Sequence, residues 1–148
     1  MDFSTSILKT VIQILHDGAR GFEEFGSSLR SPEARELFLK EAQIRLAFAQ
    51  ILDSELARFD KKNTNLGGTT VGTLHRSWGE LKGHLGGGDH ALVTTASQGE
   101  DVAVRTYRDV LDHPDLPSTI RPILLSQLGH LVESHRRVKQ LLEASAPR

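Results

Sequence analysis

Four long segments of this chain repeat apolar residues at three- and four-residue spacing, and this pattern constrains the fold more than any other feature. The predicted helices span residues 4–28, 32–60, 90–112 and 119–144. A single apolar face along each helix indicates that the helices pack against one another. No segment shows the alternation of apolar and polar residues that is typical of a strand. The sequence therefore predicts an all-α protein.

The connections between the helices predict how they are arranged. Ser31 and Pro32 form a helix start directly after the first helix, and a turn at 113–118 separates the last two helices. Each pair is therefore expected to form an antiparallel hairpin. A crossover of about residues 61–88, which contains a shorter predicted helix, joins the two hairpins. We expect one domain over residues 1–148 with the architecture of a ferritin-like four-helix bundle.

Composition excludes several classes of protein. A chain of 148 residues with 38% hydrophobic residues is long enough to bury one continuous core. Eighteen basic and 19 acidic side chains leave a net charge of -1 without a long basic block, so we expect no nucleic-acid partner. The absence of cysteine excludes disulfides and thiolate metal sites.

The same sequence gives no sign of membrane insertion or export. No run of 18 apolar residues is present, so we expect no membrane-spanning helix. The first apolar run, residues 7–15, is interrupted by polar residues and follows no basic segment, which is unlike a signal peptide. We therefore expect a cytoplasmic protein.

Three of the four long helices carry polar residues in the middle of their apolar faces, whereas the first helix carries none. These residues are Glu41 and Arg45 on the second helix, Glu100 and Tyr107 on the third, and Gln127 and His135 on the fourth. A buried charge is costly unless it is paired, and Glu41 and Arg45 have the spacing of an ion pair. The sequence therefore predicts a buried polar network of these six residues that fixes the register of the helices.

A metal site is the alternative interpretation. A ferritin-like di-iron centre takes a carboxylate from each of two helices and a Glu-x-x-His motif from each of the other two. The first helix has Phe22 where a ligand should project, and the second has Ile44 three residues after Glu41. The fourth helix has Gln127, followed three residues later by His130. This pattern approaches the di-iron constellation without completing it.

Three other kinds of site stay open. Carboxylate and imidazole groups suit an iron, manganese or zinc ion, and a small anion could instead bind within the bundle. The candidate metal ligands are Glu41, Glu100, His135 and His130. The crossover offers a different site, because His75 and Trp78 lie on one predicted helix that could anchor a partner protein. Tryptophan is a common interface anchor, although a lone tryptophan in an amphipathic helix usually belongs to the core.

Several short motifs occur along the chain in a characteristic order. They are Leu74-His75-Arg76-Ser77-Trp78, Gly99-Glu100-Asp101 with Tyr107-Arg108, Phe38 with Arg45 and Phe48, and Ser134-His135-Arg136-Arg137-Val138. Over almost its whole length the chain resembles the bacterial ferritin-like four-helix-bundle family known as domain of unknown function 2383. The resemblance implies a ferritin-like bundle and no established activity. It matches the di-iron ligands of the ferritin-like group at Glu100 and Glu41, and it keeps their last Glu-x-x-His spacing at Gln127 and His130.

These observations lead to an expected function and two alternatives. We expect a non-catalytic binding or stress-associated structural protein without a cofactor, in which a polar network replaces a degenerate di-iron site. Bundles of this kind often pair, which favours a homodimer. The first alternative is a metal-binding protein with oxidase or peroxide chemistry in the bundle core. The second is a partner-binding module built on the crossover helix around Trp78.

Overall fold

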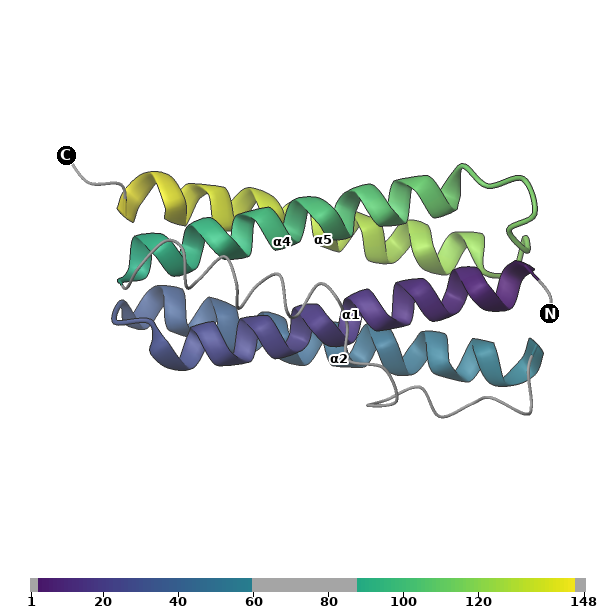
Figure 1. Ribbon diagram of the computed structural model, residues 1–148, viewed down its shortest axis with the longest axis horizontal. Helices are drawn as coiled ribbons and strands as arrows, with labels where there is room; N and C mark the ends of the chain where they lie inside the picture. The colour runs from purple at the N-terminus through teal and green to yellow at the C-terminus, as the bar shows by residue number, and fades with distance from the viewer. Residues whose placement is uncertain (1–2, 60–87, 146–148) are drawn as a thin grey trace.

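The computed structural model describes residues 3–59 and 88–145, and Figure 1 shows four long helices packed side by side. The helices are α1 (Phe3–Ser28), α2 (Pro32–Phe59), α4 (Asp89–Leu111) and α5 (Arg121–Ser145). Their ends differ by at most two residues from the predicted bounds, and the described residues contain no strand. The all-α four-helix prediction is confirmed. The predicted crossover helix, with His75 and Trp78, lies outside the described residues.

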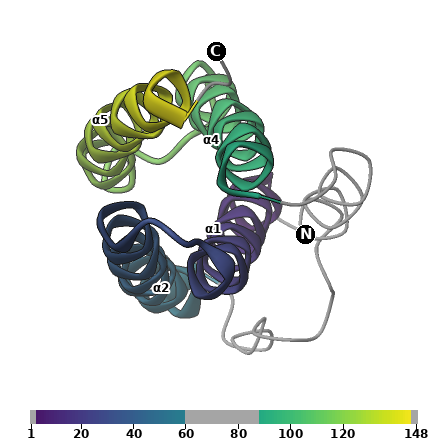
Figure 2. The same ribbon diagram turned by 90° about the vertical axis from the view of Figure 1, so that its left-hand side faces the viewer.

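The four helices form two antiparallel pairs around a common core. Viewed from one end, they follow the order α1, α2, α5 and α4 around the bundle (Figure 2). The closest packing is within the pairs α1–α2 and α4–α5, α1 also packs on α4, and α2 and α5 are the least closely packed of the neighbouring pairs. Figure 1 shows α2 and α4 running in the same direction. None of the described helices is long and apolar enough to cross a membrane.

Hydrogen bonds to the side chains of Ser31 and of Asp89 hold the turn between α1 and α2. Ser31 caps α2, because its hydroxyl accepts a hydrogen bond of 3.3 Å from the Ala34 backbone N–H. The carboxylate of Asp89, at the start of α4, accepts bonds from the backbone N–H groups of Arg30 at 2.8 Å and Ser31 at 2.9 Å. Gly26 permits the close approach of the two helices, since a Cβ there would lie 3.0 Å from Leu39 Cδ2. These contacts fix the level at which α2 begins relative to α4.

The apolar core divides into two clusters, one toward each end of the bundle. The first contains Ile7 to Leu15 of α1, Ala49 to Leu56 of α2, Ala103 to Leu111 of α4, and Leu124 and Leu131 of α5 among its members. The second contains Phe22 to Leu29 of α1, Ala34 to Ala42 of α2, Leu92 to Ala96 of α4, and Val138 of α5. The residues that separate them along each helix include Gly18, Arg45, Glu100 and Ser134. A buried polar layer therefore lies between the two clusters.

Candidate functional site

Arg45 is the centre of the polar layer. The residue is 1% exposed, which is exceptional for an arginine. Its Nε donates to Glu41 Oε2 at 2.7 Å, and its Nη2 donates to Glu100 Oε1 at 2.5 Å. A longer bond of 3.4 Å runs from Nη2 to the hydroxyl of Ser134. One guanidinium group thus joins α2, α4 and α5.

Glu100 receives a donor at each of its carboxylate oxygens. Arg45 binds Oε1, and the hydroxyl of Ser134 donates to Oε2 at 2.6 Å. The Glu100 residue is 1% exposed, so these donors replace water around the charge. Ser134 therefore links α5 to a carboxylate on α4.

Glu41 connects the layer to the edge of the bundle through His130. The Nε2 atom of His130 lies 2.9 Å from each Glu41 oxygen, and because the carboxylate accepts, Nε2 carries the proton. The imidazole side chain is 31% exposed and meets the ring of Phe48 edge-on, with 5.4 Å between centroids. His130 therefore closes the layer between α2 and α5, which are the least closely packed of the neighbouring helix pairs.

Helix α1 contributes the ring of Phe22 and the backbone at Gly18 to this layer. The Cζ atom of Arg45 lies 5.1 Å from the centroid of the Phe22 ring, within the range of a cation–π interaction. Phe22 is itself fixed by an edge-to-face contact with Phe38 at 5.0 Å. At Gly18, a Cβ would lie 3.4 Å from Arg45 Nη1, which is ordinary van der Waals contact, so the guanidinium packs close to the α1 backbone. Helix α1 thus also packs against the guanidinium, in addition to the contacts from α4 and α5.

The pairing keeps the buried groups charged. Burial alone would lower the pKa of Arg45, but the charges of Glu100 and Glu41 outweigh it, and the pKa is raised. Burial alone would raise the pKa of Glu41, but the His130 hydrogen bond and the Arg45 charge together outweigh it, and the pKa is lowered. Glu41 and Arg45 therefore stay charged inside the bundle.

A neutral pair lies next to the charged layer. The Tyr107 hydroxyl donates to Gln127 Oε1 at 2.8 Å, and Gln127 Nε2 donates to the Phe48 carbonyl at 3.4 Å. Burial raises the pKa of Tyr107, although the nearby Arg45 charge acts in the opposite direction. This pair also connects α4, α5 and α2, but without a charge of its own.

The structure distributes the six predicted network residues over three places. Glu41, Arg45 and Glu100 form one hydrogen-bonded set. Tyr107 and Gln127 bond to each other.

His135 lies away from both sets, on the outer side of the α4–α5 pair, where it lines a groove with Lys139 of its own helix. His130, which the sequence analysis named only as a metal ligand, is the histidine that meets Glu41. His135 lies outside the layer for a geometric reason, because a step of one residue turns an α-helix by about 100°. Ser134 lies on the arc of Leu131 and Val138, and His135 is therefore turned off that arc.

Four buried polar residues escaped the sequence interpretation, namely Thr5, Asp17, Thr95 and Ser134. Ser134 was missed because a lone serine on a helix carries no signal that separates a buried position from a solvated one. Asp17 of α1 is also buried, at 7% exposed, although it does not lie in the middle of the apolar face of that helix.

The candidate metal ligands do not converge in the part of the chain that the structure describes. No three His, Asp or Glu side chains there are arranged to hold a metal ion. Glu41 and His130 bond directly, the Arg45 guanidinium bonds both Glu41 and Glu100, and His135 lies in the outer groove.

The family model described as Domain of unknown function (DUF2383) matches residues 4–113, which is 110 of the 148 residues. The chain belongs to this family. The family resemblance seen in the sequence is therefore confirmed. The match to DUF2383 includes α1, α2 and α4, and with them Glu41, Arg45 and Glu100, whereas His130 and Ser134 of α5 follow the matched residues. No curated protein matches the chain.

Proposed function

We propose that this DUF2383 protein is a non-catalytic structural or binding protein whose four-helix bundle is held in register by a buried ionic layer. The observation that carries the proposal is the position of Arg45. Its guanidinium is fully buried and bonds both Glu41 and Glu100. It supplies the positive charge that a metal ion would supply between carboxylates in a bundle core.

The donors around the two carboxylates support this proposal. Each oxygen of Glu100 accepts a hydrogen bond from Arg45 or Ser134, and each oxygen of Glu41 lies within 2.9 Å of His130. A divalent ion would have to displace these donors and would also be repelled by the buried Arg45 charge. Oxidase or peroxide chemistry at this site is therefore not favoured.

A role in helix register follows from which helices the bonds connect. Arg45 and Glu100 join α2 to α4, Ser134 and Glu100 join α5 to α4, and His130 joins α5 to α2. A shift of one helix by a single turn would break several of these bonds together and leave a buried charge without a partner. Such a layer specifies one arrangement of the helices more strictly than apolar packing does.

Elemental analysis of the untagged protein tests the proposal. The protein is analysed as purified, and again after anaerobic incubation with Fe(II), Mn(II) or Zn(II) and desalting. We expect far less than one metal ion per chain, and no rise in melting temperature when metal is added. Glu100→Gln should lower stability equally with and without metal. A near-stoichiometric metal content that is lost in Glu100→Ala would instead establish a metal site and disprove the proposal.

A further inference from the structure

A polar groove lies on the outer side of α4 and α5, on a surface separate from the ionic layer. It has a volume of about 500 Å³. Helix α4 lines it with Ser97, Asp101 and Arg105, and α5 lines it with His135 and Lys139. The two helices lie side by side in Figure 2, so groups from both reach the same groove.

Positive charge is in excess in this groove. Asp101 is the one acidic residue that lines it, and its Oδ2 already pairs with Arg105 Nε at 3.0 Å. Among the described residues, no carboxylate oxygen lies within 4.0 Å of the Lys139 ammonium nitrogen, the distance that defines an ion pair. The groove therefore has a net charge of +1 when His135 is neutral and +2 when it is protonated.

The surroundings of His135 are consistent with this excess. Burial lowers its pKa first, and the charge of Lys139 lowers it further. The carboxylates of Glu100 and Asp101 and a hydrogen bond with the Ser97 backbone act in the opposite direction but do not compensate. The imidazole and the ammonium group thus line one groove, in which Asp101 supplies the one carboxylate.

We propose that this groove binds a small phosphate-bearing ligand. A phosphate has several oxygens that accept from different directions, and ammonium, guanidinium, imidazole and hydroxyl groups are its usual donors. Lys139 and His135 would bind it from α5, and Ser97 and the outer nitrogens of Arg105 from α4. A soluble phosphate monoester and a lipid phosphate headgroup share this chemistry.

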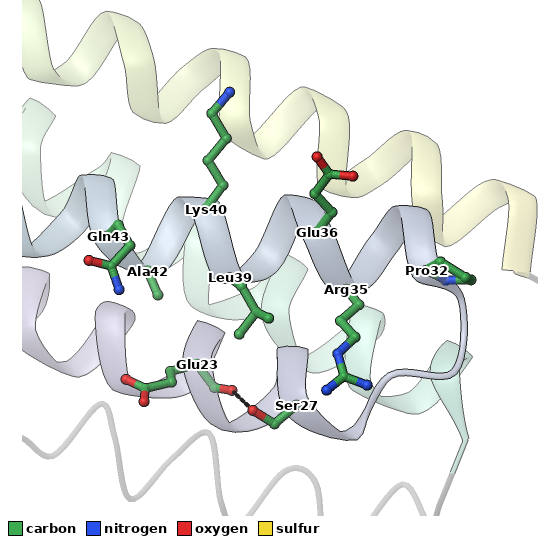
Figure 3. A pocket seen from close by; sticks show the side chains of 9 residues that line it. All are labelled: Glu23, Ser27, Pro32, Arg35, Glu36, Leu39, Lys40, Ala42 and Gln43. Atoms are coloured by element: carbon green, nitrogen blue, oxygen red, sulfur yellow. Dashed lines mark hydrogen bonds between the residues drawn. The ribbon is translucent and has the colours of Figure 1, made fainter.

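A second groove is larger than the α4–α5 groove but carries no excess of positive charge. It lies between α1 and α2, has a volume of about 720 Å³, and is lined by Glu23, Arg35, Glu36 and Lys40 around Leu39. In Figure 3, Glu36 and Lys40 stand on one side of α2, while Arg35 points toward Ser27 and Glu23 on α1. Two acidic and two basic residues balance there, so this larger groove offers no preference for an anion.

The experiment is a titration of the full-length 15N-labelled protein with inorganic phosphate at pH 7, with sodium chloride keeping the ionic strength constant. We expect saturable amide shifts centred on Ser97, Asp101, His135 and Lys139. Lys139→Ala should weaken binding about tenfold, as expected for the loss of one charged hydrogen bond. Asp101→Asn should strengthen binding, because it removes the one negative charge of the groove and releases Arg105.

Lys40→Ala is the matched control, because it removes an exposed lysine from the other groove and should leave phosphate binding unchanged. Glycerol 3-phosphate and vesicles containing phosphatidic acid then distinguish a soluble ester from a lipid headgroup. Shifts that are spread over the surface, or equal losses in Lys139→Ala and Lys40→Ala, would overturn the proposal. All three variants change exposed side chains, and circular dichroism verifies that each is folded.

Discussion

The charged layer and the neutral pair beside it are two solutions to the burial of polar groups in one bundle. Both connect α2, α4 and α5, and both lie among residues that are almost fully buried. In the charged layer, Arg45 is the cation that two buried carboxylates share. In the neutral pair, the Tyr107 hydroxyl donates one hydrogen bond to Gln127, and Gln127 donates another to the Phe48 carbonyl.

The difference predicts which set contributes more to the arrangement of the helices. Removing one member of a buried ion pair leaves a charge in a medium that solvates it poorly, at a cost of about 3–5 kcal/mol. Removing one member of a neutral hydrogen bond costs about 1 kcal/mol. The charged layer should therefore penalise a wrong register several times more strongly than the neutral pair. The following predictions test that ranking.

Replacing Arg45 should have the largest effect. Arg45→Met keeps much of the side-chain volume but leaves Glu41 and Glu100 buried without their shared cation. We expect the free energy of unfolding to fall by about 3–5 kcal/mol. Urea unfolding followed by circular dichroism measures the change.

Arg58→Met is the matched control for this prediction. Arg58 lies on the same helix, its side chain is 75% exposed, and its contact with Glu55 is long, at 3.7 Å. The control should change the free energy of unfolding by less than about 0.5 kcal/mol. If Arg45→Met costs no more than this control, the charged layer does not stabilise the bundle in the way we infer.

Glu100→Gln should have the next largest effect. The amide keeps the shape of the side chain, but it removes the charge that Arg45 binds and places an N–H₂ group opposite either Arg45 or Ser134. We expect a loss of about 2 kcal/mol, typical of a hydrogen bond to a charged group. A double-mutant cycle with Arg45→Met measures the coupling, and additive losses would show that the two side chains do not act together.

Acid should weaken the layer through Glu41. Its pKa is lowered in the folded protein relative to the ordinary value of 4.5, so the folded state binds this proton less readily than the unfolded state. The resulting stability is fully present above about pH 4.5 and is lost as the pH falls through the folded pKa.

Urea unfolding of the wild type and Glu41→Gln between pH 7 and pH 3.5 tests the sign. The difference between the two proteins should be constant near neutrality and shrink below about pH 4.5. Glu36→Gln, at an exposed position on the same helix, should differ little from the wild type throughout. A difference that grows as the pH falls would contradict the assigned direction.

The helices and half of the charged layer could be predicted from the sequence because both depend on spacing within one helix. Periodic apolar residues define the buried arc, and a four-residue step places Glu41 and Arg45 together. Glu100 was found because it lies on the arc of Val104 and Ala96. These inferences need no knowledge of neighbouring helices.

Partners on different helices could not be predicted in the same way. Their heights depend on the turn held by Asp89 and on the packing of α2 against α5, which no local pattern encodes. A rotation of one residue separates Ser134, which enters the layer, from His135, which lines the outer groove. Since a serine gives no periodic signal and a histidine is easily taken for a ligand, the sequence favoured His135.

Tyr107→Phe should have the smallest effect and so completes the comparison. The substitution removes one hydroxyl and leaves the aromatic ring, so the packing of α4 against the core is retained. Gln127 Oε1 loses this donor, while its Nε2 keeps the Phe48 carbonyl. We expect a loss of about 1 kcal/mol in urea unfolding, and an unchanged acid dependence because no charge is altered. A loss as large as that of Arg45→Met would mean that the hydroxyl supports the charged layer itself, and the two sets would then act as one network.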